Sequence, residues 1–402
     1  QVLISTIDYN EYVGRIGVGK VDNGSIRVGQ EAVIVNHHDP DKRRKVKVSK
    51  LYEFEGLGKV EVQEAQIGSI VAISGIDDLH IGDTLCAPDA VQAIPFQKIS
   101  EPTISMTFNV NDSPLAGKDG KYVTSRHLRD RLYRELNTDV SLRVEDTDST
   151  DSFKVSGRGE LHLSVLIETM RREGYEFAVS KAEVIYRKDE NGKLLEPMEQ
   201  CLIDVPEEFA GNVIQKLGER KGELVSMGAA NGGYTRLEFS IPSRGLIGYR
   251  GDFMTDTKGN GIMNTIFTGY APFKGEISYR KTGSLIAFET GTAVTYGLFN
   301  AQERGDLFIG PGEEVYSGMI VGTSAKSEDI EVNVCKMKHL TNTRASGSDE
   351  ALRLVPPRQM SLEQCLEFMA DDELLEVTPE HLRLRKSILN HEKRMKKEHR
   401  NK

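Results

Sequence analysis

The stretch 156–174 combines a glycine-flanked turn with the apolar spacing of a helix, and it constrains the fold more than any other part of the chain. Gly157 and Gly159 lie on either side of Arg158, so the backbone can turn sharply there at little steric cost. The residues that follow are apolar at i, i+3, i+4 and i+7, which places them on one face of a helix. We therefore predict a strand, a turn and a helix that packs on a core. The apolar positions are Leu163, Leu166, Ile167 and Met170.

Length and composition indicate a multidomain protein. A chain of 402 residues is too long for one ordinary core, so we expect three or four domains. No apolar run approaches the ~20 residues of a membrane span, and no signal peptide is predicted. The four cysteines form no CxxC pair, which favours a reducing compartment without structural zinc. Because the chain begins at Gln1 within a strand-like run, we expect a piece cut from a longer protein.

The hydrophobic period changes along the chain and divides it into four parts. Residues 1–96 read as short strands and predict a β-barrel. Residues 101–187 follow the order β-α-β-β-α-β, which is the ferredoxin-like arrangement, and residues 196–276 repeat it. Residues 277–402 are rich in glycine and strands and end in a basic tail. The predicted fold class is a multidomain α+β and β protein.

Two local patterns occur near the start of the chain. The Asp-Asn-Gly sequence at 22–24 predicts a tight hairpin between strands 16–21 and 25–35. Residues 14–21 nearly match the phosphate loop GxxxxGK[ST], but Val21 replaces the hydroxyl residue that binds Mg²⁺. The loop also requires a following helix, and a hairpin is predicted instead.

No catalytic constellation accompanies these patterns. We find no Ser-His-Asp, Cys-His or paired-carboxylate arrangement with a supporting context, and no HxxxH pair. We therefore expect no catalytic, cofactor-binding or metal site in this chain. The net charge of −9 argues against a protein that coats nucleic acid along its whole surface, although basic residues form several local clusters.

Several strings resemble the ribosomal GTPases of the elongation factor G group. Residues 19–30 resemble the second-domain barrel of elongation factors Tu and G, and 156–174 resemble the third domain of elongation factor G. Residues 218–223 and 241–250 are similar to its fifth domain. These motifs occur in the order expected for the group, so the resemblance covers most of the chain.

Two departures from elongation factor G narrow the resemblance. Only about twenty residues separate Phe177 from Pro197, so the long fourth domain is absent. The strings at 339–351 and 355–358 look like the C-terminal domain of the BipA/TypA translational GTPase family. LepA shares the domain plan but ends in a different sequence. The family also has a GTP-binding domain that is missing here, so GTP and Mg²⁺ are expected to bind outside this chain, which should have no GTPase activity alone.

The resemblance implies a ribosome-docking role. It implies contacts with both ribosomal subunits, mainly with large-subunit rRNA, and a C-terminal domain that reaches toward the A-site tRNA. A cytoplasmic monomer that acts in ribosome biogenesis or in translation under stress is expected, with no membrane partner. Two alternatives stay open, namely a GTP-independent RNA- or ribosome-binding module and a fragment of a LepA-like elongation factor.

Residues 336–353 fit this role chemically. Lysine and arginine neutralise phosphates, while threonine and asparagine bond to ribose or phosphate. Arg244 and Arg250 flank the second helix of the fifth-type domain, where packing or an ion pair would explain them equally well. The predicted nucleic-acid-binding residues are Lys336, Lys338, His339, Thr341, Asn342, Thr343, Arg344, Ser346, Arg244 and Arg250.

Overall fold

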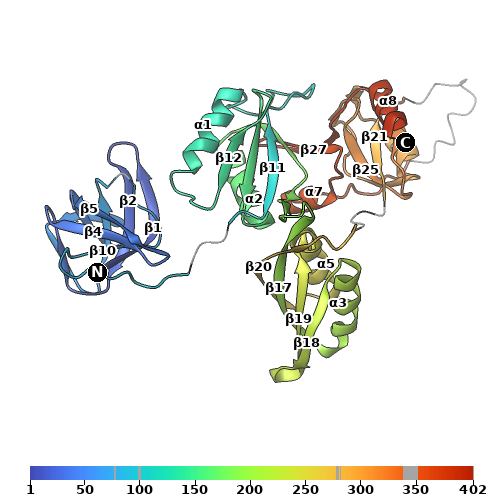
Figure 1. Cartoon of the computed structure of the whole chain (residues 1–402). Coiled ribbons are helices and arrows are strands. Elements are labelled where there is room, and N and C mark those ends of the chain that lie inside the picture. The colour runs from blue at the N-terminus through green and yellow to red at the C-terminus, as the bar shows by residue number, and fades with distance from the viewer. Residues whose placement is uncertain (77, 98–100, 278–279, 281, 338–351, 402) are drawn as a thin grey trace, which may run out of the picture. The chain divides into compact units, whose positions relative to one another are not determined.

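A computed structural model describes most of the chain (Figure 1). The described residues are 1–76, 78–97, 101–277, 280, 282–337 and 352–401. By contacts the chain divides into two compact units, Gln1–Glu101 with Arg129–Val144, and Pro102–Leu128 with Glu145–Lys402. No helix in the described residues has the length and apolarity needed to cross a membrane.

The first unit contains an antiparallel β-barrel. Eight strands pair in the order β5-β4-β10-β1-β2-β9-β6-β7, and β3 pairs with β8 separately. Apolar side chains such as Ile4, Leu51, Val71 and Ile73 are fully buried in a common core. The strands are β1 Val2–Asn10, β2 Gly14–Val21, β3 Ser25–Arg27, β4 Glu31–Asn36, β5 Asp39–Lys47, β6 Lys50–Glu55, β7 Gly58–Val62, β8 Glu64–Gln66, β9 Ile70–Ser74 and β10 Asp83–Cys86.

The hairpin predicted at residues 22–24 does not form. Strand β2 pairs with β1 and β9, whereas β3 pairs with β8, with Ile26 opposite Ala65. Gly24 has a φ of 71°, but Asn23 does not share a positive φ, so the two-residue primed turn is not made. The turn instead carries the chain from one sheet to the other. Because 14–21 is strand β2, the phosphate-loop interpretation of this stretch is excluded.

The third-type domain has the ferredoxin-like order that the sequence predicts. Its sheet runs β12-β13-β11-β14, and a short strand, β15 Glu183–Val184, also pairs with β11. Helix α2 buries the predicted apolar face, and Gly174 ends it with a φ of 94°. Gly157 is required because a Cβ there would lie 2.9 Å from His162 Nδ1. The elements are β11 Ile104–Asn109, α1 Ser125–Glu135, β12 Arg143–Asp146, β13 Ser152–Gly157, α2 Glu160–Arg172 and β14 Phe177–Ser180.

The fifth-type domain repeats this order in the strands β20-β17-β19-β18, with β16 at the end of β17. The second helix of this order is broken into α4 and α5, because Gly248 between them has a φ of 70°. The elements are β16 Arg187–Lys188, β17 Leu194–Pro206, α3 Glu207–Glu219, β18 Glu223–Ala229, the 3₁₀ turn Asn231–Gly233, β19 Tyr234–Pro242, α4 Ser243–Leu246, α5 Tyr249–Asp256 and β20 Ile262–Pro272.

The C-terminal part has a small sheet in the order β23-β25-β21-β26 and a second pair, β22-β24. Helix α7 begins with a capping box between Ser361 and Gln364. The elements are β21 Ser284–Ala287, β22 Gly291–Thr292, α6 Thr295–Gln302, β23 Gly305–Leu307, β24 Glu314–Val315, β25 Ile320–Ser324, β26 Ile330–Val332, α7 Leu362–Phe368, β27 Glu373–Val377, β28 Leu382–Lys386 and α8 His391–Asn401.

The hairpin β27–β28 does not join that small sheet. It extends the third-type sheet, where β27 pairs with β14 and Val377 lies opposite Phe177. The hairpin also contacts the C-terminal sheet, because Lys386 N donates to Gly318 O over 2.9 Å. It therefore links the C-terminal part to the third-type domain by main-chain hydrogen bonds.

Candidate nucleic-acid interface

The predicted RNA-binding segment lies only partly within the described residues. Lys338, His339, Thr341, Asn342, Thr343, Arg344 and Ser346 fall in 338–351, outside the described residues. Lys336 is described and is exposed, four positions after β26 ends at Val332. The structure therefore defines how the two ends of the segment are held.

The start of the segment is fastened to α6. Val334 is 1% exposed, and its carbonyl accepts a 2.9 Å hydrogen bond from the backbone N–H of Val294, which precedes α6. A Cβ at Gly297 would lie 2.3 Å from Val334 O, so glycine allows the helix and this strand end to approach. Lys336 thus leaves the domain from a fixed point.

The end of the segment is fastened to the same helix. The side chain of Gln302, the last residue of α6, donates from Nε2 to Arg353 O over 3.0 Å. Its Oε1 accepts a 3.0 Å hydrogen bond from Val355 N. The N-cap residue of an eight-residue helix and its last residue therefore hold the two ends of the segment. Sequence reasoning missed Gln302, because a lone glutamine at a helix end matches no motif.

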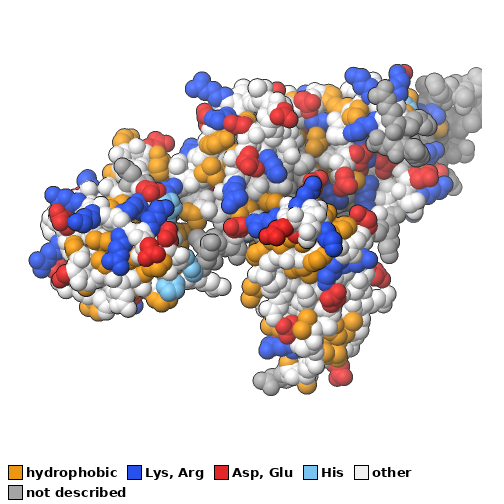
Figure 2. Space-filling model, in the orientation of Figure 1, with side chains coloured by type: hydrophobic (Ala, Val, Ile, Leu, Met, Phe, Trp, Pro, Cys, Tyr) orange, Lys and Arg blue, Asp and Glu red, His pale blue; other side chains and the backbone are white. Residues whose placement is uncertain are grey.

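A second basic element, α8, is attached beside the same strand. Glu331 of β26 accepts hydrogen bonds from His391 Nδ1 at 2.6 Å and from Arg394 Nη2. Arg394 also donates to Ile388 O over 2.9 Å, so it serves to hold the helix. Basic side chains (blue) appear over α8 in Figure 2. The exposed lysines Lys393, Lys396 and Lys397 share one face of the helix at i, i+3 and i+4 spacing.

The three basic residues of β28 are paired with carboxylates of the fold and are not available to a ligand. Arg383 pairs with Glu376 at 3.1 Å, and Lys386 pairs with Glu373 at 3.0 Å. Arg385 is 2% exposed and pairs with Asp112. The alternating sequence of β28 therefore carries buried cations that join parts of the fold.

Arg244 is also a structural residue and not part of a nucleic-acid surface. Its guanidinium is buried and forms a bidentate pair with Glu196, which is itself fully buried. It donates further to Gly275 O over 2.6 Å and lies 4.5 Å from the centre of the Phe273 ring. At Arg244 the alternative of an ion pair, and not RNA contact, therefore explains the residue. Arg250, in the first turn of α5, is exposed, and its contact with RNA stays a prediction.

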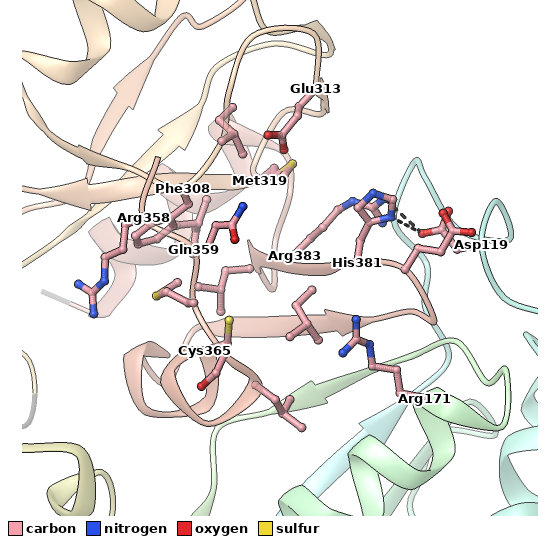
Figure 3. Close-up of a pocket in the computed structure, with 18 of the residues that line it drawn as sticks. Asp119, Arg171, Phe308, Glu313, Met319, Arg358, Gln359, Cys365, His381 and Arg383 are labelled. Carbon is pink, nitrogen blue, oxygen red and sulfur yellow. Dashed lines mark hydrogen bonds and ion pairs between the residues drawn. The ribbon is translucent and has the colours of Figure 1, made fainter. Parts of the chain in front are cut away.

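A cavity with a volume of about 970 Å³ is bordered by α2, α7 and β28 (Figure 3). Several of its charged side chains pair with one another. Asp119 Oδ2 accepts from His381 Nδ1 at 2.8 Å and from Arg383 Nη2 at 3.3 Å. Figure 3 labels the three residues and marks interactions among them by dashed lines. Arg171 donates to Thr378 O over 2.8 Å. The cavity therefore contains a network of charges that is partly neutralised by ion pairs.

This network does not form a reactive site. Burial raises the pKa of the Cys365 thiol, which lines the cavity, to about 12, so the thiol is not a nucleophile near neutral pH. Asp119, Glu380 and His381 are the candidate metal ligands among the described residues. However, Asp119 Oδ2 is already bonded to Thr378, His381 and Arg383. The trio therefore carries no metal assignment.

Three family models match parts of the chain, in the order in which these parts follow one another, with residues 87–192 outside all three matches. Elongation factor Tu domain 2 matches residues 14–86, the elongation factor G C-terminus matches 193–281, and the TypA/BipA C-terminal domain matches 282–391. The barrel followed by ferredoxin-like domains defines a member of the elongation factor G-like superfamily. Within that superfamily the chain belongs to the TypA/BipA family.

Three similar proteins from different bacteria share one description. The chain is 52% identical over 386 residues to the large ribosomal subunit assembly factor BipA of Synechocystis, 49% over 397 residues to that of Bacillus subtilis, and 50% over 390 residues to that of Salmonella typhimurium. These alignments cover 96–98% of this chain and 64% of each relative, so the chain spans somewhat less than two thirds of their length. A protein of Thermus thermophilus with a solved structure is 16% identical, with a TM-score of 0.42 over 68% of this chain and 55% of that one.

Proposed function

We propose that this chain is the ribosome-docking part of a large-subunit assembly factor and that it binds large-subunit rRNA through its C-terminal part. One observation carries the proposal. The region matching the TypA/BipA C-terminal domain contains a basic segment whose two ends are both fastened to α6. The relatives are described as large ribosomal subunit assembly factors, which supports the same role here.

The electrostatics restrict how the chain binds RNA. The net charge of −9 opposes wide contact with phosphates, so attraction is confined to local basic surfaces. Lys336 and the exposed α8 lysines provide two such surfaces, both attached to β26 and the residues after it. Few phosphates are contacted, and the salt dependence of binding is correspondingly moderate.

The proposal also includes contact with an A-site tRNA and the place where GTP and Mg²⁺ bind. Residues 336–353 contact the acceptor end of the tRNA during assembly or during translation under stress. GTP and Mg²⁺ bind to a part of the protein outside this chain, a proposal that agrees with the presence of strand β2, and not a phosphate loop, at 14–21. The protein acts in the cytoplasm as a monomer. The match of 282–391 to the TypA/BipA C-terminal domain favours this family over the LepA-like alternative.

Co-sedimentation with purified large ribosomal subunits at several salt concentrations tests the proposal. The triple variant Lys336→Ala, Lys338→Ala, Arg344→Ala should bind about tenfold more weakly and fold normally, because three phosphate contacts are lost. Unchanged binding of this variant would remove the segment from the interface. A comparison with a full-length relative in the presence of GTP tests the alternative of a GTP-independent ribosome-binding module. If this chain alone binds subunits as tightly as that relative does with GTP, the module interpretation is favoured.

A further inference from the structure

Two hairpin turns of the barrel expose apolar side chains that folding does not require. Leu57, in the turn between β6 and β7, is 109% exposed, and Tyr12, in the turn between β1 and β2, is 94% exposed. They are the two most exposed large hydrophobic residues in the described part of the chain. Isolated apolar residues on a surface are ordinary, but two on neighbouring turns form a surface that is open to a partner.

The turns themselves need no apolar residue. Gly56 supplies the positive φ of its turn, 60°, so the following position accepts a polar residue equally well. The other turn is fixed by the side chain of Asn10, whose Oδ1 accepts a 2.8 Å hydrogen bond from the backbone N–H of Tyr12. Neither Leu57 nor the Tyr12 ring contributes to the fold through burial.

The two hairpins lie together although their strands are separated in the sheet. Strand β7 is four positions from β1 in the sheet order, yet Lys59 of β7 forms an ion pair with Asp8 of β1. Lys59 Nζ also lies 5.8 Å from the centre of the Phe54 ring. The Phe54 ring, which is 41% exposed, therefore lies beside this contact. Figure 2 shows hydrophobic groups (orange) beside acidic ones (red) at this end of the barrel. The barrel-tip surface comprises Tyr9, Tyr12, Phe54, Leu57 and Val60.

The charges around the barrel-tip surface identify the kind of partner. Asp8 is paired with Lys59, and Glu61 lies 3.9 Å from Lys50. In contrast, Glu11, Glu53 and Glu55 have no ion-pair partner among the described residues. Uncompensated carboxylates repel nucleic-acid phosphates and attract lysine and arginine. Apolar anchors inside an acidic rim fit a basic protein with an apolar pocket.

We infer that the barrel-tip surface docks on a basic protein of the ribosomal subunit, with Tyr12 and Leu57 as anchors. This inference rests on the proposed ribosomal function and adds a protein contact to it. The surface is small, so the contact is transient by itself and is completed by binding elsewhere on the chain. Tyrosine provides a rigid anchor of large area, and the three carboxylates accelerate the encounter.

Site-specific photo-crosslinking tests this inference. The full chain carries p-benzoylphenylalanine at Tyr12 or Leu57, and a matched control carries it at Ile67, an exposed apolar residue elsewhere on the barrel. Each protein is irradiated with purified large and small subunits and with the proteins stripped from those subunits by concentrated salt. We expect both tip positions to cross-link to one ribosomal protein of positive net charge, and the control not to do so. The double variant Tyr12→Ser, Leu57→Ser should bind the isolated protein about tenfold more weakly.

The outcomes separate this inference from the proposed function. Cross-links to rRNA or to a second copy of the chain would overturn it, as would their absence while the chain co-sediments with subunits. If the chain does not co-sediment with subunits, the proposed function fails. The cross-linking experiment with the stripped ribosomal proteins then tests the inference by itself. A specific cross-link to one of them keeps the inference, and its absence ends it.

Discussion

Glu160, in the first turn of α2, accepts a 3.2 Å hydrogen bond from the backbone N–H of Gly248, in the break between α4 and α5. Glu367 of α7 packs on the same glycine, where a Cβ would lie 2.6 Å from its Cγ. Carboxylates from two helices therefore meet at one backbone position of a third element. Burial raises the pKa of both groups, that of Glu367 to about 7, and Asp252 adds repulsion there.

This joint predicts a pH-dependent stability. Because the folded-state pKa of Glu367 lies above its ordinary value, its contribution is fully present below about pH 4.5 and is lost as the pH rises through 7. In the wild type the free energy of unfolding should therefore fall by about 1 kcal/mol between pH 5.5 and 8, a value that allows for solvent screening. Glu367→Gln should abolish this fall. Urea unfolding at both pH values measures it. The exposed Glu328→Gln should retain the wild-type difference, and an unaltered difference in Glu367→Gln would refute the assignment.

Arg244→Ala should damage stability and not RNA contact. The substitution leaves the carboxylate of Glu196 buried without its partner, at a cost of about 3 kcal/mol. Arg250→Ala, only a few residues further on but exposed, should change stability by less than about 0.5 kcal/mol. Chemical denaturation compares the two variants. Comparable stability of the Arg244 and Arg250 variants would contradict the buried-pair account.

The α8 lysines should affect ribosome binding through its salt dependence. Replacement of Lys393, Lys396 and Lys397 with Ala should flatten the slope of log K against log salt by up to about 3, because each phosphate contact releases a counterion. The fold should persist, since Arg394 holds the helix. Arg304→Ala with Lys326→Ala provides a control of exposed cations on the same part of the chain. An identical slope in the α8 variant would show that this helix does not meet phosphate.

Gln302→Ala should weaken ribosome binding without a change at any RNA-contacting side chain. The substitution removes the hydrogen bonds to Arg353 and Val355, each worth about 1 kcal/mol, so binding should fall by up to about thirtyfold. Gln302→Glu keeps the acceptor for Val355 N but loses the donor to Arg353 O. Asn300→Ala on the same helix is the control, because its bond to Tyr296 O is local. Equal affinity of all four proteins would show that the anchor is not required.

The sequence predicts most of the architecture because its periods follow burial. Helix α2 lies where the spacing of Leu163, Leu166 and Met170 places it, and both ferredoxin-like orders form. The exceptions involve partners distant along the chain. Alternating arginines in β28 resemble an exposed strand edge, but Arg383 is paired with Asp119, 264 positions away.

The candidate site was less predictable for the same reason. The role of Arg244 depends on Glu196, 48 positions earlier, and the anchoring role of Gln302 depends on Arg353, 51 positions later. No local motif marks either pair. The exposed apolar side chains of Tyr12 and Leu57 could have been predicted from the sequence. Both residues occupy hairpin turns, where a polar residue would be tolerated and an apolar one is unusual.

The pairing of Phe177 with Val377 has a consequence for synthesis of the chain. The edge of β14 emerges about 200 residues before the strand that covers it. At 5–20 residues per second this interval lasts about 10 to 40 seconds. During that time the third-type domain presents an unpaired β edge, which is a template for association with other nascent chains. Chaperone binding near β14 should therefore be strongest in this interval and should end when β27 is added.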